Sequence, residues 1–108
     1  MIIDNDTTSK YRCPVEYTLE VIGGKWKSLI LWCLAQGEVK RYGEIKRNIN
    51  GITHKMLSQQ LKDLESQGLI HREQYNQVPP KVEYWLTEKG KTLVPILEAM
   101  CQWGSEYM

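Results

Sequence analysis

The stretch ITHKMLSQQLKDLESQGLI, residues 52–70, has the periodicity of an amphipathic helix. Its buried stripe is predicted at the i, i+4 and i+7 positions Leu57, Leu61 and Leu64. Thr53 is placed to cap the start of this helix, and Gly68 stands just past its end. The face opposite the stripe carries polar and basic side chains and no carboxylate: Lys55, Ser58, Gln59, Lys62 and Ser66. A helix face of this composition is suited to contact an anion.

The distribution of charge along the chain also favours an anionic partner. The chain has 108 residues, enough for one domain, and a net charge of only +1. Residues 39–62 nevertheless carry a net charge of +5, because Glu44 stands alone against six cations: Lys40, Arg41, Lys46, Arg47, Lys55 and Lys62. A basic segment within a nearly neutral chain is typical of a nucleic-acid-binding face.

No targeting or membrane signal is predicted. The opening MIIDNDTTSK lacks the basic start and apolar core of a signal peptide, and no run reaches the ~18 apolar residues of a membrane span. We therefore expect a cytoplasmic protein without a membrane partner, whose cysteines are reduced at rest. Cys13, Cys33 and Cys101 are too far apart for a CxxC motif, so we expect no metal and no cofactor.

The sequence motifs of common enzyme classes are missing. GGKWKS, residues 23–28, lacks the upstream glycine of a phosphate-binding loop. The sequence contains neither a GxSxG elbow nor an HExxH pair. His54 and His71 have no carboxylate partner that the sequence indicates. We therefore predict that the protein is not an enzyme.

The N-terminal part of the chain divides into an arm and the start of the domain. Residues 4–12 are polar and aperiodic, which predicts a flexible arm over residues 1–12 before a single domain over residues 13–108. Pro14 suits the first position of a helix, because its missing N–H would have no partner there. Cys13 is then the N-cap, and the helix ends at Ile22, before Gly23-Gly24.

Two further helices are predicted before residues 52–70. Lys25–Gln36 is so apolar that we expect a helix buried almost all round, which Gly37 ends. Residues 39–41 form a short extended piece, and Tyr42–Asn48 forms the next helix. The chain therefore reaches residue 52 as a series of helices with short connections.

After Gly68 the periodicity changes from that of a helix to that of strands. Residues 69–75 and 81–86 alternate well enough for two strands, joined by the turn-rich NQVPP. Thr87 then caps a final helix with a broad apolar arc, which Pro95 either kinks or begins. The chain therefore ends as a hairpin followed by a helix.

This order of elements predicts a winged helix-turn-helix, a mostly helical α+β fold with a two-stranded hairpin as the wing. In that geometry the second helix of the pair enters the DNA major groove, where glutamine can pair with adenine and lysine with guanine. On this helix the candidate DNA-binding residues are Thr53, His54, Lys55, Ser58, Gln59 and Lys62. Backbone contacts are predicted ahead of the first helix of the pair and in the wing: Lys40, Arg41, Asn76, Gln77 and Lys81.

Five stretches of the sequence, in register over roughly residues 11–105, form a recognisable set: CPV, GGKW, RYGEIKR, GITHKMLSQQLKDLESQGLI and VPPKVEYWLTEKG. Together they resemble the HxlR family of bacterial transcription regulators, relatives of MarR. The resemblance implies a homodimer on a roughly palindromic operator in double-stranded DNA, with the first and last helices as the dimer interface. Its candidate interface residues are Val15, Leu19, Leu97, Met100, Cys101, Trp103 and Tyr107. This chain has Asn50, Thr53 and Lys55 where many members have Pro, Ser and Arg. These differences affect the expected operator sequence and not the expected fold.

Cys13 is a candidate redox-sensing residue. It stands at a predicted helix N-terminus, next to Arg12 and near Lys10, and both the helix dipole and a nearby cation favour the reactive thiolate. Some members of the family that the chain resembles use a cysteine at this CP position to sense oxidants, quinones or other electrophiles. Cys101 is then a candidate partner across the two-fold axis. The alternative is a helix cap without chemistry, and we expect Cys33 to be core.

Several alternatives stay open from the sequence alone. The polar helix face, the imidazole of His54, and the charges of Lys46 and Arg47 could all be ordinary solvated surface. The fold could serve as a protein-interaction module whose basic segment meets an acidic partner. A regulator of this kind could also respond to an unidentified small-molecule inducer bound at the dimer interface.

Overall fold

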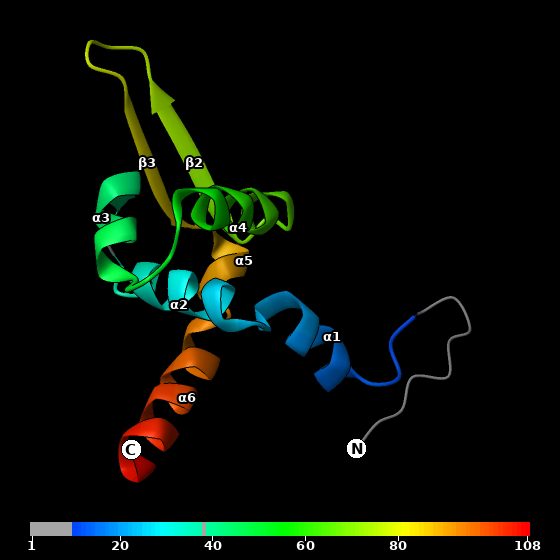
Figure 1. Ribbon diagram of the computed structural model, residues 1–108. Helices are drawn as coiled ribbons and strands as arrows, with labels where there is room; N and C mark the ends of the chain where they lie inside the picture. Colours follow the sequence, from blue (N-terminus) through cyan, green and yellow to red (C-terminus); the bar gives the residue numbers. More distant parts are fainter. Residues whose placement is uncertain (1–9, 38) are drawn as a thin grey trace.

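The computed structural model describes residues 10–37 and 39–108, so most of the predicted arm lies outside the described residues. Helices dominate, and a small three-stranded antiparallel sheet completes the fold (Figure 1), as predicted for a winged helix-turn-helix. In chain order the elements are α1 Pro14–Ile22, α2 Lys25–Leu34, β1 Lys40–Arg41, α3 Tyr42–Asn48, α4 His54–Ser66, β2 Ile70–Tyr75, β3 Lys81–Leu86, α5 Glu88–Lys91 and α6 Val94–Tyr107.

The helix-turn-helix is formed by α3, a short turn and α4. Gly51 in the turn has a φ of 87°, a left-handed conformation that glycine adopts without steric cost. Thr53 caps α4 as predicted, because its hydroxyl accepts a hydrogen bond from the Met56 amide at 3.1 Å. Gly68 follows the end of α4 with a φ of 75°. Local chemistry therefore fixes both ends of the helix that the sequence singled out.

The wing is not simply a two-stranded hairpin, because a third strand joins it. The sheet order is β1-β3-β2, with both neighbouring pairs antiparallel. Lys40 faces Tyr84 and Arg41 faces Glu83, so the short extended piece before α3 pairs with the wing. The two-stranded prediction was therefore incomplete: a two-residue strand has too little pattern to be recognised before its partner is known.

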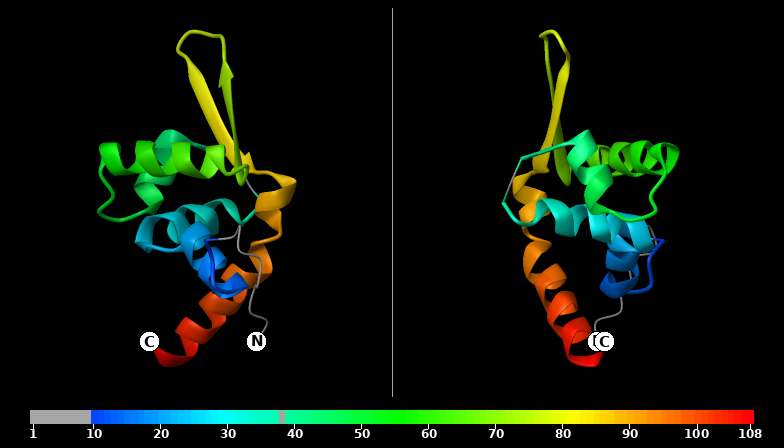
Figure 2. Two further views of the ribbon diagram at one scale, coloured as in Figure 1. Left: turned by 90° about the vertical axis from the view of Figure 1, so that its right-hand side faces the viewer. Right: turned by 60° about the vertical axis from the view of Figure 1, so that its left-hand side comes forward.

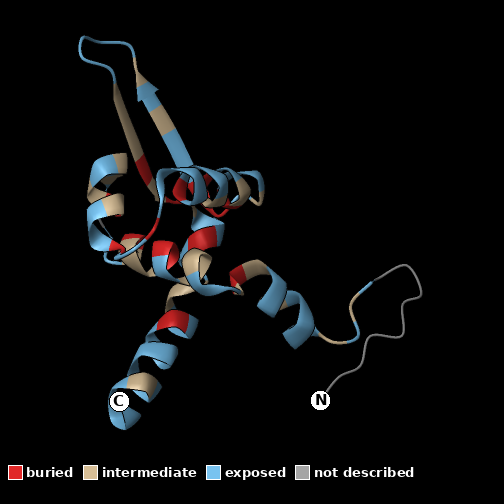
Figure 3. Cartoon of the chain, viewed as in Figure 1, coloured by how far each residue is buried: buried red, intermediate tan, exposed pale blue. Residues whose placement is uncertain are grey.

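The core lies between α2, α3, α4 and the inner face of the sheet (Figure 3). The predicted stripe of α4 is buried as expected, with Leu57, Leu61 and Leu64 each no more than 3 % exposed. Burial of each such leucine stabilises the folded state by about 1.5–3 kcal/mol relative to an exposed position. The buried apolar residues are Ile22, Ile30, Leu31, Leu34, Ile45, Ile49, Ile52, Leu57, Leu61, Leu64, Leu69, Ile70, Tyr84, Leu86 and Leu97.

The prediction that the second helix is buried almost all round was wrong. In α2 only Ile30, Leu31 and Leu34 are buried, whereas Leu29 and part of Trp32 face outward. The reason is that α1 and α6 diverge from α2, which leaves one side of it uncovered within a single chain (Figure 2). The helix also ends at Leu34, two residues early, in a tightened turn.

The predicted final helix is divided into α5 and α6. Thr87 caps α5, and Pro95 stands in the first turn of α6, so Pro95 marks a true helix start. Gly90 lets α5 approach the end of α4, since a β-carbon at this position would lie 2.1 Å from the Leu69 carbonyl oxygen. The Thr87 hydroxyl donates to the Gly68 carbonyl oxygen and the Thr87 amide donates to that of Leu69, which stabilises the same contact. The C-terminal helix is thereby anchored to the helix-turn-helix.

The helices α1 and α6 extend away from the body on the side opposite the wing (Figures 1 and 2). Much of their apolar surface is exposed, including Trp103 at 67 % and Leu19 at 61 %. Within residues 10–37 and 39–108, no helix combines the length and apolar character that crossing a membrane requires.

Candidate nucleic-acid interface

The outer face of α4 presents a row of exposed side chains. Lys55, Ser58, Gln59 and Lys62 are all exposed, while the leucines of the same helix hold it to the core. The first turn of α4 carries no acidic residue. Its N-terminal end therefore offers hydrogen-bond donors and positive charge on a rigid support, which suits the edges of bases and phosphate oxygens.

A tyrosine of α3 holds the start of this face in place. The Tyr42 hydroxyl lies 3.1 Å from His54 Nδ1, 3.3 Å from the His54 carbonyl oxygen and 3.4 Å from Ser58 Oγ. The phenol ring also stacks on the imidazole, with centroids 5.8 Å apart and planes 6° apart. His54 is therefore not a freely solvated imidazole. Sequence reasoning missed Tyr42, because its partners lie across the helix-turn-helix turn and not on its own helix.

Two carboxylates of α4 flank this face. Asp63, half-buried at one flank, accepts a hydrogen bond from the Gln59 side-chain amide at 3.3 Å. Glu65 lies at the other flank and borders a groove together with Lys62 and Arg72. The N-terminal half of α4 is free of acidic side chains, and the carboxylates stand at its C-terminal half, where they orient and partly neutralise the donors.

Further cations lie on the elements next to α4. Arg41 is exposed at the N-terminus of α3, where its amide donates to the Glu44 carboxylate at 2.9 Å, and Lys40 before it is half-buried. Arg72, on β2, borders the same groove as Ser58 and Lys62, so it belongs to the basic surface although the sequence did not single it out. Strand alternation could have found it, because residues 70, 72 and 74 share the face of the sheet that packs on α4.

Of the candidate DNA-binding residues in the wing, some are exposed and one contacts side chains of its own sheet. Asn76 and Gln77 are exposed in the loop between β2 and β3. Lys81 is placed differently from the prediction: its ammonium lies 3.5 Å from a Glu83 carboxylate oxygen and 4.8 Å from the centroid of the Tyr75 ring. By strand alternation these three side chains occupy the sheet face away from α4, so Lys81 is held there by its own neighbours.

The candidate dimer-interface residues differ in how far they are buried within the single chain. Leu97 is 4 % exposed and packs in the core of its own chain, so the expectation that it faces a partner was wrong. The other candidates, Val15, Leu19, Met100, Cys101, Trp103 and Tyr107, are exposed on α1 and α6. The rings of Trp103 and Tyr107 lie 4.9 Å apart. An apolar aromatic surface is therefore present on the last helix.

The three cysteines are free and lie in different environments. Cys13 is half-buried at the N-cap of α1, where its carbonyl oxygen accepts hydrogen bonds from the Glu16 and Tyr17 amides. Of the two cations expected near it, Arg12 and Lys10, the second is engaged elsewhere, because Lys10 pairs with Glu20 at 3.3 Å. Cys33 is half-buried and accepts a hydrogen bond from Asn48, so the expectation of a core position was only partly correct.

Comparison with known proteins identifies close relatives. A family model described as HxlR-like helix-turn-helix matches residues 21–108. The uncharacterized HTH-type transcriptional regulator YkvN of Bacillus subtilis is 57 % identical over 98 residues, which are 91 % of this chain and 82 % of YkvN. The redox regulator HypR in its oxidized form has a TM-score of 0.84 and 51 % identity, covering 89 % of this chain and 98 % of HypR. Diamide-treated YodB from B. subtilis has a TM-score of 0.70 and 33 % identity, covering 88 % of this chain and 94 % of YodB.

Proposed function

Since the chain belongs to the HxlR-like helix-turn-helix family and is a transcriptional regulator of the helix-turn-helix type, we propose that it binds duplex DNA as a homodimer. The outer face of α4 is the observation that carries this proposal. Its four exposed polar and basic side chains stand on the second helix of the helix-turn-helix, the element that enters the major groove in this fold. Transcription is then controlled by where the dimer lies relative to a promoter.

In this proposal the residues divide into base readers and backbone contacts. Lys55, Ser58 and Gln59 read base edges, because a lysine matches guanine acceptors and a glutamine amide matches adenine. Arg41, at the N-cap of α3, and Arg72, on β2, bind phosphates and set the register of docking. Asn76 and Gln77 place the wing loop along the backbone. Thr53 acts indirectly, by capping the helix.

Dimerisation through α1 and α6 is the second part of the proposal. A single chain leaves Met100, Trp103 and Tyr107 exposed along α6, and aromatic and methionine side chains are enriched at protein interfaces. A symmetric pairing of these helices places two copies of α4 about one helical turn of DNA apart, which matches a palindromic operator.

A fluorescence-anisotropy titration tests the function directly. The full chain is titrated into duplexes from upstream of its own and neighbouring genes, each beside a scrambled duplex. We expect selective binding whose affinity falls steeply with salt, since each phosphate contact releases counterions. An absence of binding to every duplex at low salt would contradict the proposal and favour a protein-interaction module.

Substituting Tyr42 by phenylalanine is expected to relax sequence discrimination. Loss of the hydroxyl frees His54 and Ser58, and a hydrogen bond of this kind contributes about 0.5–1.5 kcal/mol. We expect the ratio of operator to scrambled-duplex affinity to fall by about 3–10-fold, with a nearly unchanged melting temperature. Tyr17→Phe, on the exposed face of α1, is the matched control. A preserved ratio in Y42F would show that Tyr42 does not position the reading residues.

Oxidant sensing through Cys13 is the third part of the proposal. Relatives solved in oxidized and diamide-treated forms motivate it, as does a thiol at the start of a helix that is proposed to lie in the dimer interface. Cys101, exposed on α6, is the candidate thiol of the partner subunit. Diamide would accept two electrons and two protons from the two thiols as the disulfide forms.

Replacing Cys13 by serine is expected to abolish the response to diamide without changing DNA affinity in the reduced state. Anisotropy titrations of treated and untreated protein measure both quantities, and non-reducing electrophoresis detects a cross-linked dimer. Cys33→Ser serves as the control, because Cys33 lies far along the chain on a different helix. An undiminished diamide response in C13S would assign the sensing to another residue.

A further inference from the structure

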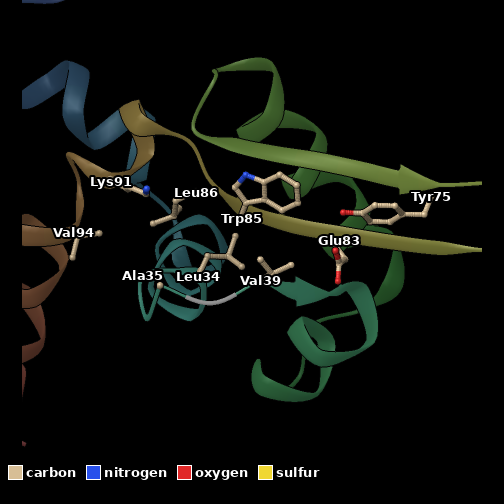
Figure 4. Close-up of a pocket in the computed structure, with 10 residues that line it drawn as sticks. Leu34, Ala35, Val39, Tyr75, Glu83, Trp85, Leu86, Lys91 and Val94 are labelled. Carbon is tan, nitrogen blue, oxygen red and sulfur yellow. The ribbon is translucent and has the colours of Figure 1, made fainter.

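A cavity lies on the face of the sheet away from α4. Its volume is about 500 Å³, which falls in the range of small-molecule sites. One wall is apolar and is formed where α2 ends, the sheet begins and α6 starts, with Leu34, Val39 and Val94 among its residues. Trp85 stands in the middle, and Tyr75 and Glu83 close the other end (Figure 4). The cavity is separate from both the proposed DNA face and the exposed face of α6.

The end formed by Tyr75 and Glu83 already holds a cation. The Lys81 ammonium lies 4.8 Å from the centroid of the Tyr75 ring and 3.5 Å from Glu83 Oε2. A carboxylate beside an aromatic face is a favourable arrangement for an ammonium group. A hydrogen bond to Glu83, the largest cause, raises the pKa of Tyr75. Figure 4 shows Tyr75 and Glu83 adjacent at this end of the cavity.

The two charged ends of the cavity differ in their exposure. The Glu83 side chain is 20 % exposed, whereas that of Lys91, at the opposite end, is 59 % exposed and pairs with Glu88 on the surface. A carboxylate sheltered from water attracts an opposite charge more strongly than an exposed one. Glu73 stands directly across from Glu83 on the same sheet face, where its carboxylate pairs with the His71 imidazole at 3.0 Å and leaves Glu83 as the acceptor that lines the cavity. The sheltered end of the cavity therefore favours positive charge.

We propose that this cavity binds a lipophilic organic cation. Its ammonium group takes the place of Lys81 between Glu83 and the Tyr75 ring, and its hydrophobic body lies along Trp85 and the apolar wall. Binding requires only that Lys81 exchange its position, because the remaining groups already form the site. The Lys81 side chain is therefore a built-in competitor of the ligand.

This exchange couples the cavity to the wing. Lys81 is the first residue of β3, directly after the wing loop, so an ammonium displaced from Glu83 becomes available to a nearby phosphate. We expect the bound cation to raise affinity for duplex DNA by a few-fold, and DNA to raise affinity for the cation equally. This coupling rests on the proposed function, whereas binding of the cation does not.

Isothermal titration calorimetry of the full chain tests the site with two probes of similar size and opposite charge. They are (2-naphthylmethyl)trimethylammonium and 2-naphthylacetate. We expect the cation to bind at least tenfold more tightly than the anion, and Glu83→Gln to remove that preference. Lys81→Gln should strengthen cation binding several-fold, a gain that a misfolded protein could not produce. Lys10→Gln is the control, because Lys10 likewise pairs with a carboxylate, that of Glu20, and lies over a tyrosine ring, that of Tyr11, but does not line the cavity. It should leave cation binding unchanged.

Three results would overturn the proposal: equal or tighter binding of the anion, no binding of either probe at millimolar concentration, or weaker cation binding in K81Q. The same probes added to a DNA titration measure the coupling. If the chain binds the cation but no duplex, the proposed function fails and the cavity site stands. If it binds DNA but not the cation, the reverse holds.

Discussion

Lys55→Glu is expected to weaken operator binding by at least about 100-fold while leaving the fold intact. The substitution removes a base contact that contributes about 1–3 kcal/mol and places a carboxylate against the DNA. It does not destabilise the helix, because the first turn of α4 has no acidic residue and a negative charge is favourable at a helix N-terminus. Binding and stability should therefore change independently.

The measurement is an anisotropy titration beside thermal unfolding of the same protein. Lys91→Glu is the matched control, with the same change of charge on an exposed position of α5 that is not part of the outer face of α4. We expect the control to lose only the small part of DNA affinity that depends on net charge. Similar losses in the two variants would indicate that DNA does not contact the face of α4.

Trp103→Glu is expected to convert the dimer into monomers and thereby to weaken operator binding. A buried tryptophan at the centre of an interface commonly contributes about 2–4 kcal/mol, and a carboxylate there also introduces an unpaired charge. In this chain Trp103 is 67 % exposed and lies against Tyr107, so its substitution should change the free energy of unfolding of the monomer little. DNA affinity falls because a dimer tethers its second α4 at high effective concentration.

Sedimentation equilibrium of wild type and variant measures the assembly. Val39→Glu is the control, since Val39 is also a partly exposed apolar residue but lies near β1, away from α1 and α6. We expect V39E to stay dimeric. A dimeric W103E would assign the interface to another surface.

The sequence was sufficient to predict the helix-turn-helix because its signals are local. The leucine stripe of α4, the Thr53 cap, and the glycines in the turn and after the end of α4 are signals that span only a few positions. The bounds of α3 and β3 were likewise predicted as the structure has them. The family resemblance added what periodicity alone cannot give, namely the expectation of a homodimer with the first and last helices at its interface.

Features that depend on distant partners could not be predicted in this way. Tyr42 contacts residues 54 and 58, beyond the turn, and the Lys81 ammonium lies beside Glu83 and the Tyr75 ring. The outward side of α2 depends on how far α1 and α6 diverge. In each case the side chain and its local pattern were visible, whereas the neighbour that decides its role comes from another element.

The pairing of β1 with β3 has a consequence for how the domain opens. Lys40 pairs with Tyr84 and Arg41 with Glu83, so this short ladder brackets the whole helix-turn-helix between its two strands. Arg41 is also the N-cap of α3, which ties the start of that helix to the wing. We therefore expect α3, α4 and the sheet to form one cooperative unit in native-state hydrogen exchange, with amide protection that rises and falls together, while α1 exchanges earlier.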